Sequence, residues 1–149
     1  MPLIGYTIKI TKEFAAQHSA DIGLSTDSKN IKQVAESFDL FTDYTRNDDL
    51  ASDSAGKLDT INDLVLYEEQ NRNVKYDYIL DLDVTSPLRS LSDLNSALHT
   101  LKSNTLALNI FSVNKAHETP YFNMVEQKEN GFYNVVKPGT NFLSRQSAP

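Results

Sequence analysis

Hydrophobic side chains recur every three or four positions in four stretches of the chain, and short apolar runs lie between those stretches. The first stretch, residues 2–17, predicts an amphipathic helix whose first position is Pro2, where the missing N–H costs nothing. The same spacing predicts three further helices. Their apolar faces run from Ile31 to Phe38, from Leu58 to Val65 and from Leu91 to Leu101.

Short polar side chains mark the starts of two of these helices. Asp27 or Ser28 precedes the second helix, and either side chain can cap it by accepting a hydrogen bond from a backbone N–H. Ser90, with Asp93 three positions later, matches the capping-box pattern and predicts the start of the fourth helix. Residues 39–56 are polar and predict an ordered loop.

The short apolar runs predict strands at residues 21–25, 76–82 and 105–113. Helices that alternate with such strands predict an α/β fold with a mainly parallel sheet, because right-handed βαβ units usually connect parallel strands. Sheets of this kind bind ligands beyond the carboxyl ends of their strands. We therefore expect Ser25–Ser28 and Asp83–Pro87 to line one edge of a shared cleft.

Residues 114–142 differ in character from the rest of the chain. Phe122–Gln127 and Phe132–Lys137 are strand-like and flank Asn130-Gly131, a strong signal for a hairpin turn. Five aromatic residues gather here: Tyr121, Phe122, Phe132, Tyr133 and Phe142. Because an isolated hairpin is marginally stable in water, we expect an arm that dimerises the protein. A hairpin that folds back on its own sheet is the alternative.

Composition excludes several classes of function. The net charge is −6 and the basic residues form no run, which argues against a nucleic-acid partner. The absence of Cys excludes disulfides, thiolate zinc sites and thiol nucleophiles, and the three His are widely spaced. No apolar run is long enough to span a membrane, and the first residues lack the layout of a secretory signal. The expectation is a soluble, cytoplasmic protein with no membrane partner.

One segment carries a resemblance to a known family. Thr85-Ser86-Pro87-Leu88-Arg89 resembles the Thr-Ser-Pro-Leu-Arg signature of the acylneuraminate cytidylyltransferases, the CMP-sialic acid synthetases. Further segments are similar to family segments in the same order: Pro2–Ile8, Ser25–Ser28, Arg46 with Leu50–Ala55, Pro120-Tyr121 and Ser144–Gln146. The resemblance covers essentially the whole chain. It implies that residues 1–149 form a partial cytidylyltransferase domain with a three-layer nucleotidyltransferase fold, which is Rossmann-like and glycosyltransferase-A-like.

The resemblance also implies a reaction. In the family, the anomeric hydroxyl of a sialic-acid-type nonulosonic sugar attacks the α-phosphorus of CTP, giving a CMP-sugar and pyrophosphate. The reaction needs in-line positioning and neutralisation of phosphate charge more than a protein nucleophile, so no catalytic residue is assigned. Magnesium is the implied cofactor, and a homodimer that pairs through the arm is the implied assembly.

Matching positions supply the candidate site residues. The candidates for binding the nucleotide are Ser25, Asp27, Arg46, Ala55 and Lys57. The candidates for binding the sugar are Asp83, Thr85, Ser86, Tyr121 and Arg145. Five of them also have a simpler interpretation. Arg46 could pair with Asp48 or Asp49, Thr85 and Ser86 could only shape a turn, Tyr121 could be core or interface, and Arg145 could be solvated.

The chain departs from the family pattern at several points. The Gly/Arg/Lys-rich loop of the family would precede the first helix and its Asp-x-Asp metal ligands would follow Arg145, so we expect little CMP-sugar synthesis from residues 1–149 alone. Asp83 stands where many members have Gln, Lys57 where many have Ser or Thr, and Ser147 where many have Asp. Asp rather than Gln at position 83 is consistent with a subgroup of the family that acts on a related nonulosonic acid, such as legionaminic acid.

Two other functions remain open at this point. A glycosyltransferase of similar fold would use Asp81 and Asp83 as an Asp-x-Asp pair that holds a metal and a nucleotide sugar, since alternation places both on one face of a strand. A catalytically silent remnant would bind nucleotide or pair with a full-length subunit.

Overall fold

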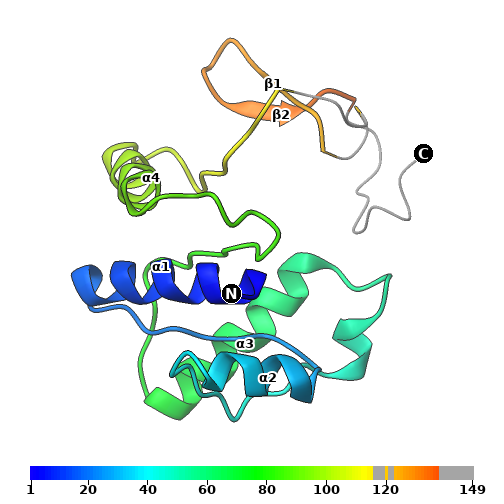
Figure 1. The fold of residues 1–149 in the computed structure, drawn as a ribbon. Helices are drawn as coiled ribbons and strands as arrows, with labels where there is room; N and C mark the ends of the chain where they lie inside the picture. The colour runs from blue at the N-terminus through cyan, green and yellow to red at the C-terminus, as the bar shows by residue number, and fades with distance from the viewer. Residues whose placement is uncertain (116–119, 121–122, 138–149) are drawn as a thin grey trace.

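A computed structural model describes residues 1–115, 120 and 123–137. Its regular elements are α1 (Leu3–His18), α2 (Lys29–Glu36), the 3₁₀ helix η1 (Asp48–Ala51), α3 (Lys57–Arg72), α4 (Leu91–Ser103), β1 (Val125–Gln127) and β2 (Tyr133–Val135). Figure 1 shows α1 lying between α4 on one side and α2 with α3 on the other. No helix in the described ranges is long and apolar enough to cross a membrane.

The four helices confirm the prediction from hydrophobic spacing, with small shifts at their ends. Pro2 is the N-cap of α1 and has an extended backbone (φ −67°, ψ 157°), so it stands one position before the expected one. Ser28, and not Asp27, caps α2, because its hydroxyl accepts a hydrogen bond from the Ile31 N–H at 3.4 Å. The predicted capping box of α4 is present, with Ser90 and Asp93 each bonded to the other's backbone N–H.

The core forms where α1 meets α2 and the residues that follow it. Ile8, Ala35 and Leu40 are buried together, and Phe38 packs against them. Gly5 permits this approach, because a Cβ at that position would come within 2.6 Å of the Phe38 ring. A side chain larger than hydrogen at residue 5 would therefore push the Phe38 ring away from α1.

Polar contacts join α1 to α4. The Asn95 side chain lies 2.7 Å from His18 Nε2 and donates to Gln17 Oε1 at 3.1 Å. The ring of His18 also lies against Phe14, with 4.3 Å between the ring centroids. Side-chain hydrogen bonds therefore join the first half of α4 to the last turn of α1.

The three strands predicted at residues 21–25, 76–82 and 105–113 are not formed in this structure. An apolar run becomes a strand only when a neighbouring segment completes its hydrogen-bond ladder. The side chain of Tyr78 is 50% exposed and that of Leu108 is 95% exposed, so the runs at residues 76–82 and 105–113 are not buried. Ile22 and Leu24, in the run at residues 21–25, are partly buried and pack against the core. The parallel sheet and the three-layer nucleotidyltransferase fold stay predictions for this chain.

The hairpin prediction is confirmed, with shorter strands than the pattern indicated. β1 and β2 are antiparallel, with Val125 opposite Val135 and Gln127 opposite Tyr133. Figure 1 shows this hairpin projecting away from α1, α2 and α3. The dimerisation of the arm stays a prediction, and its residues 116–119, 121–122 and 138–142 lie outside the described ranges.

Asn130-Gly131 forms the hairpin turn in a different way from a two-residue Asn-Gly turn. The Gly131 N–H donates to Lys128 O at 2.9 Å, which closes a turn over residues 128–131. Gly131 alone has a positive φ in this turn, at 82°, and Asn130 Oδ1 accepts from the Phe132 N–H at 3.1 Å. A turn followed by a left-handed glycine is the second common hairpin geometry.

Candidate functional site

Arg46 and Ser25, both candidates for nucleotide binding, are in direct contact. Arg46 Nε donates to Ser25 Oγ at 3.0 Å, and Arg46 Nη2 donates to the Ser25 carbonyl at 2.7 Å. The backbone N–H of Arg46 also donates to Thr26 O at 3.0 Å. The expected alternative, an ion pair with Asp48 or Asp49, is not formed among the residues that the structure describes.

The local backbone explains how Arg46 reaches Ser25. From residue 41 to residue 47, exposed and less exposed positions alternate, with Thr42, Tyr44 and Arg46 on the inner side. This is the period of extended chain, in which residues two apart face the same way. Tyr44 is only 4% exposed. The segment that the sequence marked as a polar loop therefore has one buried side.

Tyr44 connects this segment to α3, and sequence reasoning missed it. Its hydroxyl donates to Asp63 Oδ2 at 2.6 Å, and its ring lies 5.2 Å from the Tyr67 ring one helical turn further along. Burial and the Asp63 hydrogen bond raise the pKa of the Tyr44 phenol, while the nearby Ser25 side chain and the charge of Arg46 lower it less. The available signal was the two-residue spacing between Tyr44 and Arg46.

Lys57 brings the two predicted sets of residues together. It is the first residue of α3, and its ammonium lies 2.6 Å from Asp81 Oδ2 and 4.0 Å from Asp83 Oδ2. A cation at a helix N-terminus is disfavoured by the helix dipole, so the two carboxylates offset an unfavourable position. A nucleotide candidate, Lys57, thus lies beside a sugar candidate, Asp83.

Asp83 organises the loop that carries the resemblance. Its Oδ1 accepts from the Thr85 N–H at 3.1 Å and from the Thr85 hydroxyl at 2.9 Å. Its carbonyl accepts from Ser86 N at 3.3 Å and from Arg89 Nη2 at 2.6 Å. The Thr85 backbone and hydroxyl bonds, followed by Lys57 and Arg89, lower the pKa of Asp83 against the opposing effect of desolvation.

These contacts keep Asp83 ionised at neutral pH and confirm that Thr85 and Ser86 shape a turn. Both side chains are also exposed. The Ser86 hydroxyl has no hydrogen-bond partner among the residues that the structure describes, so it can still meet a ligand.

The carboxylates of Asp81 and Asp83 do not fit a magnesium site, because the Lys57 ammonium already lies against both of them. In the ranges that the structure describes, no group of three or more His, Asp or Glu side chains could hold a metal ion. In this chain, the Lys57 ammonium therefore lies where the Asp-x-Asp pair of a glycosyltransferase would bind a metal ion.

Curated proteins match most of this chain. It is 35% identical over 129 residues to post-translational flagellin modification protein B of Campylobacter coli. It is 36% identical over 129 residues to the CMP-N,N'-diacetyllegionaminic acid synthase of Campylobacter jejuni, and 34% identical over 101 residues to the Legionella pneumophila enzyme of that name. These three relatives agree with the resemblance of residues 85–89 to the CMP-sialic acid synthetase family.

The chain spans about half the length of the curated relatives that it matches. The matches cover 86%, 86% and 68% of the chain, and 53%, 53% and 42% of the respective relatives. No family model and no solved structure matches the chain. The similarity to the family therefore rests on the three relatives together with the segment at residues 85–89.

The remaining candidate residues lie apart from the two contacts described above. Asp27 is exposed beside the start of α2. Ala55 is half-buried, and its N–H donates to Ser52 O at 3.1 Å, just before α3. Tyr121 and Arg145 lie outside the described residues.

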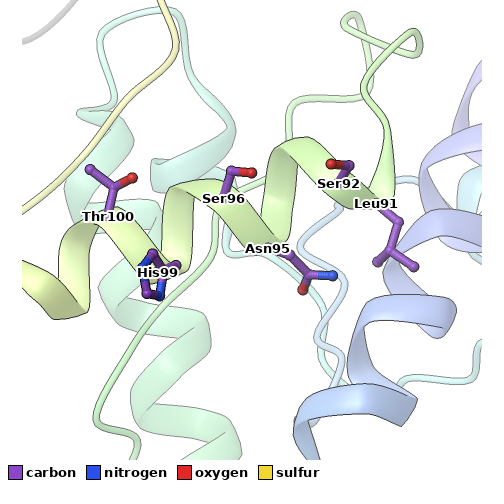
Figure 2. Close-up of a pocket in the computed structure, with 6 residues that line it drawn as sticks. All are labelled: Leu91, Ser92, Asn95, Ser96, His99 and Thr100. Carbon is purple, nitrogen blue, oxygen red and sulfur yellow. The ribbon is translucent and has the colours of Figure 1, made fainter.

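A hollow of about 640 Å³ lies along one face of α4 (Figure 2). All of its lining residues come from that one helix: Leu91, Ser92, Asn95, Ser96, His99 and Thr100. None of the candidates for nucleotide or sugar binding lines it. The candidate site residues therefore lie outside this hollow.

Proposed function

We propose that this chain binds CTP and a nonulosonic acid and takes part in transferring CMP from CTP to the sugar, which gives a CMP-sugar and pyrophosphate. The names of the Campylobacter jejuni and Legionella pneumophila relatives support this proposal, and they suggest N,N'-diacetyllegionaminic acid as the sugar. Asp83, which stands where many family members have Gln, favours the same choice of a sugar other than sialic acid itself.

The observation that supports CTP binding is the hydrogen bonding of the Arg46 guanidinium. Its Nε and Nη2 atoms are fixed on Ser25, while Nη1 has no hydrogen-bond partner among the residues that the structure describes. A planar guanidinium that is half-buried, held in place and free of a carboxylate partner suits a phosphate or a base carbonyl. Arg46 therefore provides the charge that CTP needs.

The sugar side rests on the loop around Asp83. The ionised Asp83 carboxylate accepts hydrogen bonds only, and the exposed Thr85 and Ser86 hydroxyls can both donate and accept. A nonulosonic acid offers hydroxyl and amide donors that match such a loop. Helix α3 connects this side to the nucleotide side, because Lys57 and Asp63 lie about 9 Å apart along its axis at 1.5 Å per residue.

In the proposed reaction, the anomeric hydroxyl of the sugar attacks the α-phosphorus of CTP while the bond to pyrophosphate breaks. The residues of this chain would contribute orientation and charge neutralisation rather than a covalent intermediate. Magnesium, which the family resemblance implies, has no ligand set among the described residues, and no role of Arg46 or Asp83 in this proposal depends on it. The glycosyltransferase alternative has less support, because Lys57 engages Asp81 and Asp83.

Binding of CTP by the purified chain tests the proposal, with amide NMR shifts as the measurement. We expect CTP to shift the signals of Ser25, Arg46 and Lys57, and ATP to shift them less. Arg46→Ala should weaken CTP binding at least about 10-fold, because hydrogen bonds to charged groups are the strong ones. Lys9→Ala, which removes an exposed cation of α1, is the matched control and should leave affinity unchanged.

Two results would count against the proposed function. One is the absence of any CTP-specific shift, and the other is an unchanged affinity in Arg46→Ala. For the sugar, N,N'-diacetyllegionaminic acid should shift the signals of residues 83–86 more than N-acetylneuraminic acid does. Equal shifts with the two sugars would remove the support for a legionaminic-type substrate.

A further inference from the structure

Within the described ranges, the hydrogen bonds of residues 84–88 all go to Asp83. The Thr85 N–H and hydroxyl donate to Asp83 Oδ1 at 3.1 and 2.9 Å, and the Ser86 N–H donates to the Asp83 carbonyl at 3.3 Å. Thr85, Ser86 and Leu88 are all exposed, so packing holds the tip of this loop only weakly. The positions of the Thr85 and Ser86 hydroxyls therefore depend on what holds Asp83.

Two cations contact Asp83 from outside these residues. The Lys57 ammonium lies 4.0 Å from the Asp83 carboxylate and is closer to Asp81, at 2.6 Å. Arg89 Nη2 instead donates to the Asp83 carbonyl at 2.6 Å. Because a carbonyl belongs to the backbone, whereas a carboxylate can rotate on its side chain, the Arg89 bond fixes the course of the chain itself. The side chain of Arg89 thus closes the loop between residues 83 and 89.

The start of α4 gives Arg89 a rigid base. Ser90, the next residue, is the N-cap of that helix, and its capping box with Asp93 fixes the backbone at this point. Arg89 therefore connects Asp83 to a fixed position rather than to another part of the loop. A hydrogen bond from a charged donor is stronger than one between neutral groups, so a single bond of this kind can hold a short loop closed.

Stability alone does not account for an arginine at this position. Arg89 Nη1 is buried and has no hydrogen-bond partner among the residues that the structure describes. A buried donor without a partner costs free energy, so this part of the guanidinium destabilises the fold. Only Nη2 makes a hydrogen bond within the described ranges, and it makes it to the loop. A lysine ammonium could make the same single bond.

We propose that Arg89 is a positioning residue, which holds the Asp83 carbonyl and thereby fixes the Thr85 and Ser86 hydroxyls for binding the sugar. The role of those hydroxyls toward a nonulosonic acid rests on the function proposed above, whereas the hold of Arg89 on the loop does not. Arg89 acts without touching the sugar, because its Nη2 is occupied by Asp83 and its Nη1 is buried. Arg89 and Ser86 would act as one unit, so their effects on sugar binding should not add.

The first test needs no ligand. Hydrogen exchange of the Thr85 and Ser86 amides, followed by NMR in the purified chain, reports on the closed loop. Arg89→Met keeps an unbranched side chain and removes the donors, and it should speed both exchanges about 5-fold, as expected for one lost hydrogen bond. Arg89→Lys should restore the slow exchange, because one charged donor is enough. Lys9→Met, which removes an exposed cation of α1, is the control and should change neither rate.

An internal reference separates loosening of the loop from unfolding of the helix. The Leu94 N–H donates to Ser90 O at 3.3 Å inside α4, and Leu94 is buried. Its exchange rate should stay the same in Arg89→Met. Unchanged Thr85 and Ser86 rates in Arg89→Met, or an equal acceleration at Leu94, would overturn the proposal.

The second test measures the affinity for N,N'-diacetyllegionaminic acid by NMR titration. Arg89→Met should weaken binding of this sugar about 5-fold and leave CTP affinity unchanged, and Arg89→Lys should restore sugar binding. In a Ser86→Ala background, the effect of Arg89→Met should be smaller. An undiminished effect in that background would overturn the proposal, because Arg89 would then act by another route. A chain that fails to bind the sugar refutes the proposed function, while the exchange measurement still decides whether Arg89 holds the loop.

Discussion

The ammonium group of Lys57 lies 2.6 Å from the carboxylate of Asp81, so the first residue of α3 is bonded to the segment that follows the helix. Asp83 lies 4.0 Å from the same ammonium. The contact connects a position predicted for the nucleotide with a position predicted for the sugar. It also places a fixed positive charge where a metal-binding pair of carboxylates would otherwise hold a cation.

Replacing Lys57 by Met should raise the pKa of Asp83, because the lysine charge contributes to its lowered value. The pKa should stay below the ordinary value of an aspartate, since the larger Thr85 contributions remain. The free energy of unfolding at pH 7 should fall by no more than about 1 kcal/mol, because the Lys57 side chain is 62% exposed and solvent screens the pair. Carboxyl ¹³C NMR titration measures the pKa, and urea unfolding measures the stability. Lys9→Met is the control, and an unmoved Asp83 pKa would contradict the assigned contact.

Ser90→Ala should destabilise α4, because it removes the hydroxyl that accepts from the Asp93 N–H at 3.2 Å. We expect a Tm lower by about 2–4 °C, the usual size of a lost N-cap in a chain of this length. Thermal unfolding followed by circular dichroism measures it. Ser92→Ala, at an exposed position of the same helix, should leave Tm within one degree or so. An identical Tm for Ser90→Ala and Ser92→Ala would show that the cap contributes nothing.

Alkaline pH should destabilise the protein through Tyr76. Burial, together with a hydrogen bond to Asp21 Oδ2 at 2.8 Å, raises the pKa of Tyr76 from 10.0 to about 12. The folded state therefore favours the protonated phenol, so this contribution is fully present below pH 10 and is lost as pH rises toward 12. Urea unfolding across this range should show decreasing stability. Tyr76→Phe should reduce the decrease of the unfolding free energy with pH without abolishing it, since Tyr44 also has a raised pKa. An unchanged decrease would show that Tyr76 is not its cause.

The hairpin should mediate self-association. Phe132 and Tyr133 are 36% and 48% exposed on an arm that projects from the helices, and exposed aromatic clusters are typical of interfaces. Replacing both by Ser should shift the mass in solution from dimer to monomer, as measured by multi-angle light scattering. Glu129→Ser in the exposed turn is the control. A chain that is monomeric at every concentration before substitution would show that the arm does not dimerise it.

Elements that depend on near neighbours in the chain were predictable. Helical spacing, the Ser90–Asp93 capping box and the Asn130-Gly131 turn act over a few residues, and each appears in the structure. Strands at residues 21–25 and 76–82 were not found, because a strand needs a partner segment that local pattern does not specify.

The sequence alone determined the family resemblance and the residue types at the candidate site, including Arg46, Lys57 and Asp83. Only the tertiary structure decided which of these residues meet. Ser25 receives Arg46, Lys57 reaches Asp83, and the buried Tyr44 joins Asp63, a contact that no spacing rule indicates. The reason is physical: hydrogen bonds and ion pairs act over a few ångströms, and the packing of α3 against distant segments sets those distances.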